Sequence, residues 1–155
     1  MSTCVPLFVA SDVRVIGAPS MPAPAAAKTA RFAVIGPGTG LGVGALMMQD
    51  GRPSAFETEG GHTSFAPRTE EDIEILRRLA ARFGRVPNER LLCGSGLTNL
   101  HEALGEIHRI DTGTLPPEEI TRRAAANTDP ACVRTLETFC ALLGAVAGDF
   151  VLAFG

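Results

Sequence analysis

The feature that most constrains the fold is a glycine-rich run beside a short apolar segment. The stretch VIGPGTGLGVGALM, residues 34–47, places four glycines and one proline within residues 36–42. Glycine loses more conformational freedom on folding than any other residue, so such a run marks a special backbone angle or a close approach. Two interpretations are open from this stretch alone. One is a loop that joins two strands, and the other is a cradle whose backbone N–H groups bind an anion, most often phosphate.

The hydrophobic pattern alternates between strands and helices along most of the chain, which predicts an α/β fold. The segment 31–36 is a short run of β-forming residues that ends at a glycine. The dipeptide Asp50-Gly51 is a strong hairpin signal, so two antiparallel strands are expected within 42–60. The apolar run at 90–94 predicts a further buried strand, and all of these strands are expected to share one sheet.

The helix expected at 70–83 has the most complete set of local signals. Thr69 can cap its N-terminus, Asp72 completes an acidic version of a capping box, and Gly84 can end it. The apolar residues at helical spacing are Ile73, Leu76, Leu79, Ala80 and Phe83. Three more helices are expected, at 97–109, 116–127 and 130–153. The helices at 70–83 and 130–153 are expected to pack on the sheet.

The composition argues against several classes of protein. A chain of 155 residues suits one domain with one core. It carries a net charge of −3, has no basic stripe and contains no Trp or Tyr, so a nucleic-acid surface is not expected. The mean hydropathy of +0.17 is that of a globular protein. The apolar segment 139–155 contains Asp149 and is shorter than a membrane span, so a buried core helix is expected and contact with a membrane is not.

The cysteines indicate a reducing environment. They stand at positions 4, 93, 132 and 140, and none has the CxxC spacing of a zinc site. Cys132 and Cys140 lie too far apart along an expected helix for an easy disulfide. Four free thiols that act as small buried residues are expected, which favours a cytoplasmic protein. Residues 1–30 are expected to form a separate segment with a Pro/Ala-rich linker at 18–30, ahead of one domain at 31–155.

A second cluster of functional residue types follows the expected hairpin. The stretch ETEGGHTSFAP, residues 57–67, brings Glu59, two glycines and His62 together. The Glu59 carboxylate can accept hydrogen bonds from two neighbouring hydroxyls and His62 can donate or accept, which suits a sugar. A solvated turn with a satisfied imidazole is the alternative. A metal site is less favoured because only one histidine is local, and His101 and His108 are expected on an exposed helix face.

A third stretch, NERLLCGSGL, places Glu89 just before the apolar run, where it fits a strand-edge charge in water when taken alone. The three stretches together resemble the bacterial glucokinase family in order and in spacing. These enzymes are ATP-dependent glucose kinases of the actin-like, hexokinase-type superfamily. The resemblance covers nearly all of residues 31–155 and, more loosely, residues 5–30.

The resemblance implies a fold, a set of site residues and cofactors. The implied fold is part of an actin-like, ribonuclease H-like C-terminal domain, with a mixed sheet and packed helices. The implied cofactors are ATP and Mg²⁺, and full-length members are expected to be homodimers. The family's phosphate-binding turn matches Gly36, Gly38, Thr39 and Gly40. Its glucose-binding residues match Glu59, Gly60, Gly61, His62 and Glu89. The CxC zinc cluster of some relatives does not occur in the sequence, and no metal ligand is expected.

The resemblance also identifies family features that this sequence lacks. They are a D-I-G-G-T-N phosphate loop, an N-D pair whose Asp is the general base for the sugar 6-hydroxyl, and a strand and Gly-Gly turn that grip the adenosine. Asp12 matches the segment after the base and not the base itself. We therefore expect an internal portion of a glucokinase, inactive alone, with no catalytic residue of its own. The alternatives are a non-catalytic sugar-binding or interaction module and a protein that needs a separately supplied N-terminal half.

Overall fold

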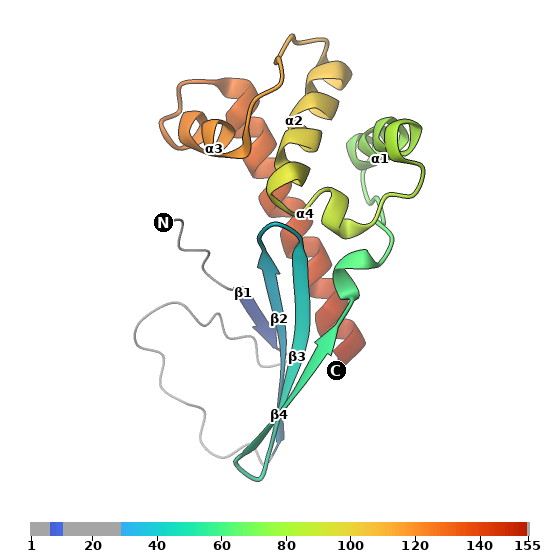
Figure 1. The fold of residues 1–155 in the computed structure, drawn as a ribbon, viewed down its shortest axis with the longest axis vertical. Helices are drawn as coiled ribbons and strands as arrows, with labels where there is room; N and C mark the ends of the chain where they lie inside the picture. The colour runs from blue at the N-terminus through green and yellow to red at the C-terminus, as the bar shows by residue number, and fades with distance from the viewer. Residues whose placement is uncertain (1–6, 11–28, 155) are drawn as a thin grey trace.

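The computed structural model describes residues 7–10 and 29–154, which form a four-stranded sheet, four α-helices and two short 3-10 turns (Figure 1). Neighbouring strands pair antiparallel in chain order. The strands are β1 (Leu7–Ala10), β2 (Thr29–Pro37), β3 (Leu41–Gln49) and β4 (Arg52–Thr58). The predicted α/β class and the strands at 31–36 and within 42–60 are confirmed.

Two tight turns set the register of the sheet. Asp50 and Gly51 join β3 to β4 with φ values of 50° and 76°, the left-handed conformation that a two-residue hairpin turn requires. The glycine-rich loop 38–40 joins β2 to β3, with Pro37 opposite Leu41. This loop lies at the end of the sheet that faces the helices (Figure 1).

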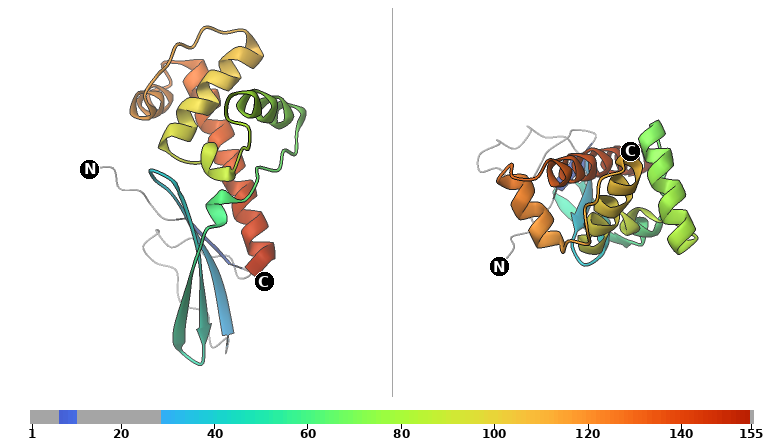
Figure 2. Two further views of the ribbon diagram at one scale, coloured as in Figure 1. Left: turned by 45° about the vertical axis from the view of Figure 1, so that its right-hand side comes forward. Right: turned by 90° about the horizontal axis from the view of Figure 1, so that it is seen from above.

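The helices form a second layer that extends past one end of the sheet (Figures 1 and 2). The long helix α4 packs against β2 and continues beside α2 and α3. A large cluster of buried side chains joins Ala33 and Ile35 of β2 to Val146 and Phe150 of α4. The helices are α1 (Glu70–Phe83), α2 (Gly94–His108), α3 (Pro117–Ala125) and α4 (Pro130–Phe154).

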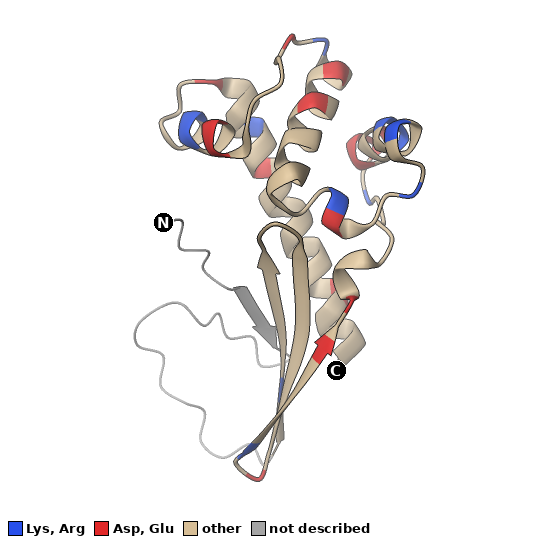
Figure 3. Cartoon of the chain, in the orientation of Figure 1, with Lys and Arg blue, Asp and Glu red and all other residues tan. Residues whose placement is uncertain are grey.

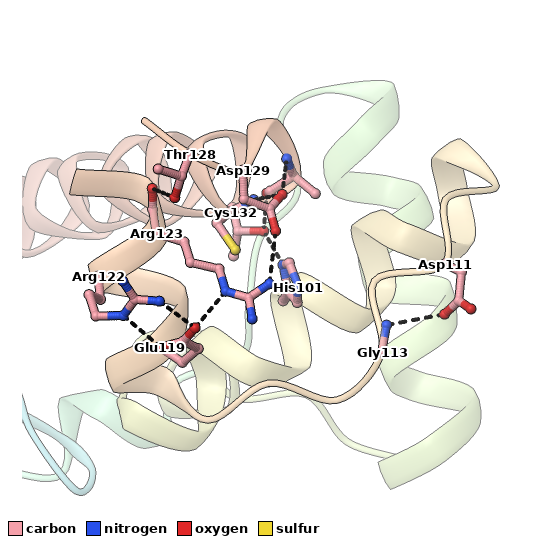
Figure 4. A network of polar contacts seen from close by, with 11 residues as sticks. His101, Asp111, Gly113, Glu119, Arg122, Arg123, Thr128, Asp129 and Cys132 are labelled. Atoms are coloured by element: carbon pink, nitrogen blue, oxygen red, sulfur yellow. Dashed lines mark hydrogen bonds and ion pairs between the residues drawn. The ribbon is translucent and has the colours of Figure 1, made fainter. Parts of the chain in front are cut away.

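The corner between α3 and α4 is held by polar contacts (Figure 4). The Asp129 carboxylate accepts hydrogen bonds from the N–H groups of Ala131 and Cys132, at 3.0 and 3.4 Å, and so caps α4. Hydrogen bonds from Arg122 and Arg123 lower the pKa of Glu119 to about 2. Burial raises the pKa of the Cys132 thiol to about 11, so this thiol stays protonated at neutral pH.

Helix α4 is also long and apolar enough to cross a membrane, and it is the one such helix among the described residues. Core helices of globular proteins meet the same criterion, and one face of α4 is part of this core. The buried residues of that face are Leu142, Val146, Ala147 and Phe150. Its opposite face includes Leu152, which is 84% exposed.

The strand predicted at 90–94 is wrong. Leu91 and Leu92 are buried, but they lie in a turn between a 3-10 turn, η2 (Asn88–Arg90), and α2. Their N–H groups both donate to the carbonyl oxygen of Asn88, at 3.0 and 2.9 Å. The side-chain amide of Asn99 donates to the carbonyl oxygen of Arg90. Because the backbone is satisfied locally, this apolar run is buried without a strand partner.

Helix α1 has the predicted ends but a different packing face. Thr69 and Asp72 form the predicted capping box, and Gly84 ends the helix. The helix packs against α2, so the prediction that it packs on the sheet is wrong. The predicted apolar face is also partly wrong. Ile75, which was not part of it, is fully buried, whereas Phe83, which was part of it, is 36% exposed at the end of the helix. The buried face of α1 instead consists of Asp72, Ile75 and Leu79.

Two predictions about single residues are also wrong. His101 was expected on an exposed helix face, but it is 1% exposed, with its Nδ1 2.9 Å from the Thr135 hydroxyl. Cys140 was expected to be buried and is exposed. Cys93 and Cys132 are buried free thiols, as predicted. Cys4, and the segment and linker predicted within 1–30, lie almost wholly outside the described residues.

Candidate functional site

The turn that carries Glu59 and His62 begins where β4 ends. The Thr58 hydroxyl donates to the carbonyl oxygen of Val43 on β3 at 2.9 Å and accepts the N–H of Gly60 at 3.1 Å. The chain then forms a 3-10 turn, η1 (Gly60–His62). Thr58 therefore anchors the start of this turn to the sheet.

Both glycines of η1 are buried because the structure leaves no room for a side chain there. A Cβ at Gly60 would lie 2.8 Å from the Phe150 ring, and a Cβ at Gly61 would lie 2.1 Å from the Leu41 carbonyl oxygen. Real Cβ atoms do not approach other heavy atoms so closely. The two glycines thus bring η1 directly against β3 and α4.

Glu89 reaches the same place from η2. Its Oε2 accepts the N–H of Leu41 at 3.2 Å, across 48 residues of sequence. A Cβ at Gly40 would lie 2.5 Å from the same oxygen. The glycine at position 40 therefore leaves the space in which the Glu89 carboxylate lies beside the glycine-rich loop.

His62 lies between two carboxylates. Its Nε2 is 3.5 Å from Glu59 Oε2, and its Nδ1 is 3.9 Å from Glu89 Oε1. The side chains are 90% exposed for Glu59, 54% for His62 and 34% for Glu89. The site is thus an open surface cluster with two groups that accept hydrogen bonds and one imidazole. Such a set can bind several adjacent hydroxyls.

The glycine-rich loop contacts the start of α2. The Gly38 N–H donates to the Gly40 carbonyl oxygen at 2.7 Å, and the Gly94 N–H donates to the Gly38 carbonyl oxygen at 2.9 Å. Thr39 is exposed at the tip, and neither its N–H nor its hydroxyl bonds to another described residue. A free hydroxyl and N–H on an open tight turn fit phosphate oxygens. Gly36 lies at the end of β2 and supports the loop from the strand.

The structure therefore brings together side chains and loops that are far apart in sequence. Glu59, His62, Glu89 and the loop at Gly40 come together. The loop between β2 and β3 lies at the junction between sheet and helices (Figure 1). Glu89 was expected beside a strand, but η2 carries it. Among the described residues, no group of three or more His, Cys, Asp or Glu side chains could hold a metal ion.

Sequence reasoning missed the residues that hold this cluster in place. Asn88 is 6% exposed, and its Nδ2 donates to the Thr63 hydroxyl at 2.9 Å. Arg85 donates through Nη2 to the His62 carbonyl oxygen at 2.6 Å. In the sequence, Asn88 stands next to Glu89 and Thr63 stands next to His62. This adjacency could have drawn attention to them, but it does not show that the two side chains bond to each other.

Comparison with known proteins identifies what the chain is similar to. The family model described as Glucokinase matches residues 1–155. The chain is 55% identical over 143 residues to a glucokinase of Xanthomonas campestris pv. campestris (strain B100), which covers 92% of this chain and 42% of that protein. It is 48% identical over 151 residues to a glucokinase of Stenotrophomonas maltophilia (strain R551-3), covering 97% of this chain and 45% of that protein.

Solved structures agree with this similarity. A crystal structure of a glucokinase from an Antarctic psychrotroph matches with a TM-score of 0.76 and 28% identity, over 100% of this chain and 44% of that chain. A glucokinase from Balamuthia mandrillaris, solved in complex with glucose, matches with a TM-score of 0.65. At 18% identity, over 76% of this chain and 35% of that chain, this second match shows the fold alone. The chain spans less than half the length of these relatives.

Proposed function

The chain belongs to the glucokinase family, and on that premise we propose that its open cluster is the sugar-binding part of an ATP-dependent glucose kinase. The observation that carries the proposal is the meeting of three separate motifs. Glu59 and His62 lie on one turn and Glu89 lies on another, and the Glu89 carboxylate accepts the N–H of Leu41, the first residue after the glycine-rich loop. A sugar site beside a phosphate loop is the arrangement that transfer of a phosphoryl group to a sugar hydroxyl requires.

Each residue has a proposed role. Glu59 and Glu89 accept hydrogen bonds from glucose hydroxyls, and His62 contacts a further hydroxyl. Gly60 and Gly61 bring the turn close enough to the sheet for the sugar to lie against its backbone. The glycine-rich loop, with Gly36, Gly38, Thr39 and Gly40, faces the phosphates of ATP. Bound ATP with Mg²⁺ would supply the phosphoryl group, and the residues of this chain would hold the sugar in position for it.

The proposal extends to the setting of the protein. We place it in the cytoplasm, with residues 31–155 as part of a glucokinase C-terminal domain, and full-length relatives are proposed to act as homodimers. The described cysteines are free thiols, which fits a reducing compartment. No Asp of an N-D pair is present in the sequence to accept the proton of the sugar 6-hydroxyl. Loss of such a base costs about 10²–10⁴ in rate, so we expect the 155-residue chain by itself to bind glucose without phosphorylating it.

The experiment separates binding from turnover. Glucose is titrated into the isotope-labelled 155-residue chain by NMR, and glucose 6-phosphate is measured with ATP and Mg²⁺ in a coupled assay. We expect signals of η1 and η2 to shift and no glucose 6-phosphate to form. Glu59→Gln and Glu89→Gln should each weaken glucose binding about tenfold or more, because each removes a charged hydrogen-bond acceptor. Unchanged binding in both variants would contradict the sugar site.

A second candidate, a module completed by another polypeptide, is favoured by one observation. The chain spans only 42–45% of its curated relatives. Addition of a polypeptide that carries the D-I-G-G-T-N loop and the N-D pair would distinguish the two cases. Restored formation of glucose 6-phosphate supports complementation, whereas glucose binding without restored activity supports a non-catalytic sugar-binding module.

A further inference from the structure

A continuous series of hydrogen bonds runs beneath the open cluster, from the Glu89 turn to the sheet. Asn88 Nδ2 donates to the Thr63 hydroxyl at 2.9 Å, and that hydroxyl donates to the Gly60 carbonyl oxygen at 2.7 Å. The Gly60 N–H continues the series to the Thr58 hydroxyl at 3.1 Å, which donates to Val43. Each member except Val43 lies within three residues of Glu59, His62 or Glu89.

The direction of these bonds fixes the orientation of the Asn88 amide. A threonine hydroxyl has one hydrogen, and Thr63 donates it to the Gly60 carbonyl oxygen. The Thr63 oxygen can therefore only accept from Asn88, so the amide nitrogen and not the amide oxygen must face it. The Asn88 Oδ1, on the other side of the amide, is buried without a partner among the described residues.

Backbone contacts join the same two turns. The Asn88 N–H donates to the Thr63 carbonyl oxygen at 2.9 Å, and the Phe65 N–H donates to the Val86 carbonyl oxygen at 2.9 Å. Arg85 adds its 2.6 Å bond to the His62 carbonyl oxygen. These contacts hold η1 and η2 side by side. The Thr63 N–H also donates to the Gly60 carbonyl oxygen at 3.0 Å, and the Asn88–Thr63 side-chain bond adds a second connection to that oxygen through the Thr63 hydroxyl.

From this geometry we infer that Asn88 and Thr63 are positioning residues that set the spacing of Glu89 from His62 and Glu59. They touch no substrate in this inference. They act because a shift of either turn moves one carboxylate relative to the other, and a rigid sugar ring needs both at once. The part that concerns glucose rests on the proposed function, whereas the part that concerns the spacing of the side chains does not.

The test uses a pair of variants at Thr63, which is exposed to solvent. Thr63→Val keeps the shape of threonine and removes the hydroxyl, while Thr63→Ser keeps the hydroxyl and serves as the matched control. Thr63→Val leaves the Asn88 amide without its partner and removes the hydroxyl bond to the Gly60 carbonyl oxygen, which keeps the Thr63 N–H at 3.0 Å. We expect it to weaken glucose binding to the 155-residue chain about three- to tenfold, the loss expected from one neutral hydrogen bond. We expect Thr63→Ser to bind as the unchanged chain does.

A second readout does not depend on glucose. The ring signals of His62 in NMR spectra report its distance from Glu59 and Glu89, and we expect Thr63→Val to displace them and Thr63→Ser to leave them in place. Asn88→Ala should displace the same signals in the same direction, and the double variant should add little further change. If the unchanged chain does not bind glucose, the proposed function fails while the His62 signals still decide the positioning role. Unmoved His62 signals in Thr63→Val, or equal changes in Thr63→Ser, would overturn the inference.

Discussion

The β3–β4 hairpin and the helical part of the molecule differ in how their apolar residues are covered. In the helices, Ile75, Leu79 and Leu100 are fully buried in the main core cluster, and Ile120 is fully buried in a second, smaller one. In the hairpin, β4 is exposed over residues 52–57 and Phe56 is 51% exposed. An open hollow of about 400 Å³ lies between the hairpin and the end of α4, lined by Phe32, Met47 and Phe154 among others.

Charge follows the same division. Charged residues gather on the helices and at the tip of the hairpin, while the middle of the sheet carries few (Figure 3). The helices are linked by ion pairs such as Glu71 with Arg134 and Arg82 with Glu102. The candidate site lies where the two regions meet. Glu89 lies on η2, which is next to the well-packed helices. Glu59 and His62 lie on η1 at the end of the more open hairpin, where hydrogen bonds hold the turn in place.

The largest expected effect tests whether stability resides in the helices. Leu100→Ala removes a fully buried side chain from the main core and should destabilise the protein by about 2–5 kcal/mol. Phe56→Ala, its control in the hairpin, should cost no more than about 1 kcal/mol, because the ring is half exposed. Urea denaturation followed by circular dichroism measures both. Equal losses would show that the hairpin contributes as much to stability as the helices.

The next effect concerns the junction itself. Gly61→Ala places a Cβ 2.1 Å from the Leu41 carbonyl oxygen, so the backbone must move, at a cost of about 1–3 kcal/mol. Gly36→Ala is the control, because a Cβ there meets nothing within 4 Å and the residue has no left-handed backbone angle. Thermal unfolding should show a lower Tm for Gly61→Ala and little change for Gly36→Ala. Similar Tm values for both variants would mean that the junction relaxes easily.

A smaller, pH-dependent effect should arise in the helices. Burial lowers the pKa of His101, although Asp129 and Glu102 oppose the shift. The unfolded chain then takes up the proton more readily, so stability is present above the ordinary histidine pKa of about 6.5 and falls as the pH drops through the lower folded value. One proton limits this slope to about 1.4 kcal/mol per pH unit.

The variant His101→Gln removes this titration and keeps a polar partner for Thr135. Its unfolding free energy should change less between pH 7 and pH 5 than that of the unchanged chain. Carboxylates with lowered pKa values, such as Glu71, also reduce the stability of the fold at acid pH. They do so equally in both proteins, so their contribution cancels in the comparison. An identical pH slope in both proteins would exclude His101 as the source.

Local signals predicted the helices better than the connections between them. The capping box of Thr69 and Asp72 and the glycine at position 84 predict the ends of α1 correctly. The run at 90–94 misled because apolar content alone does not distinguish a strand from a buried turn. Its burial comes from α2 and the surrounding core, which a local pattern does not contain.

The same limit applies to the candidate site. The residue types at Glu59 and His62 suggested a sugar site and the family resemblance added Glu89, and the structure places the three together. The side chains that support them could not be predicted, because the Asn88–Thr63 bond joins residues 25 apart and leaves no periodic trace. The burial of His101 was missed for a related reason, since its partner Thr135 lies on α4, 34 residues further along the chain.

The smallest expected effect compares one substitution in both regions. Gly144 lies on the exposed side of α4, and a Cβ there would meet nothing within 4 Å. Gly144→Ala should therefore stabilise the protein by about 0.5–1 kcal/mol, because alanine loses less backbone entropy in a helix. The equivalent change in the hairpin, Gly44→Ala, places a Cβ 3.2 Å from the Phe56 carbonyl oxygen, so β4 must yield by a few tenths of an ångström. If the hairpin is as open as its exposure indicates, this strain is relieved cheaply and Gly44→Ala changes the unfolding free energy little. A loss above about 1 kcal/mol for Gly44→Ala, measured beside a gain for Gly144→Ala, would instead show that the hairpin resists displacement as firmly as a packed core does.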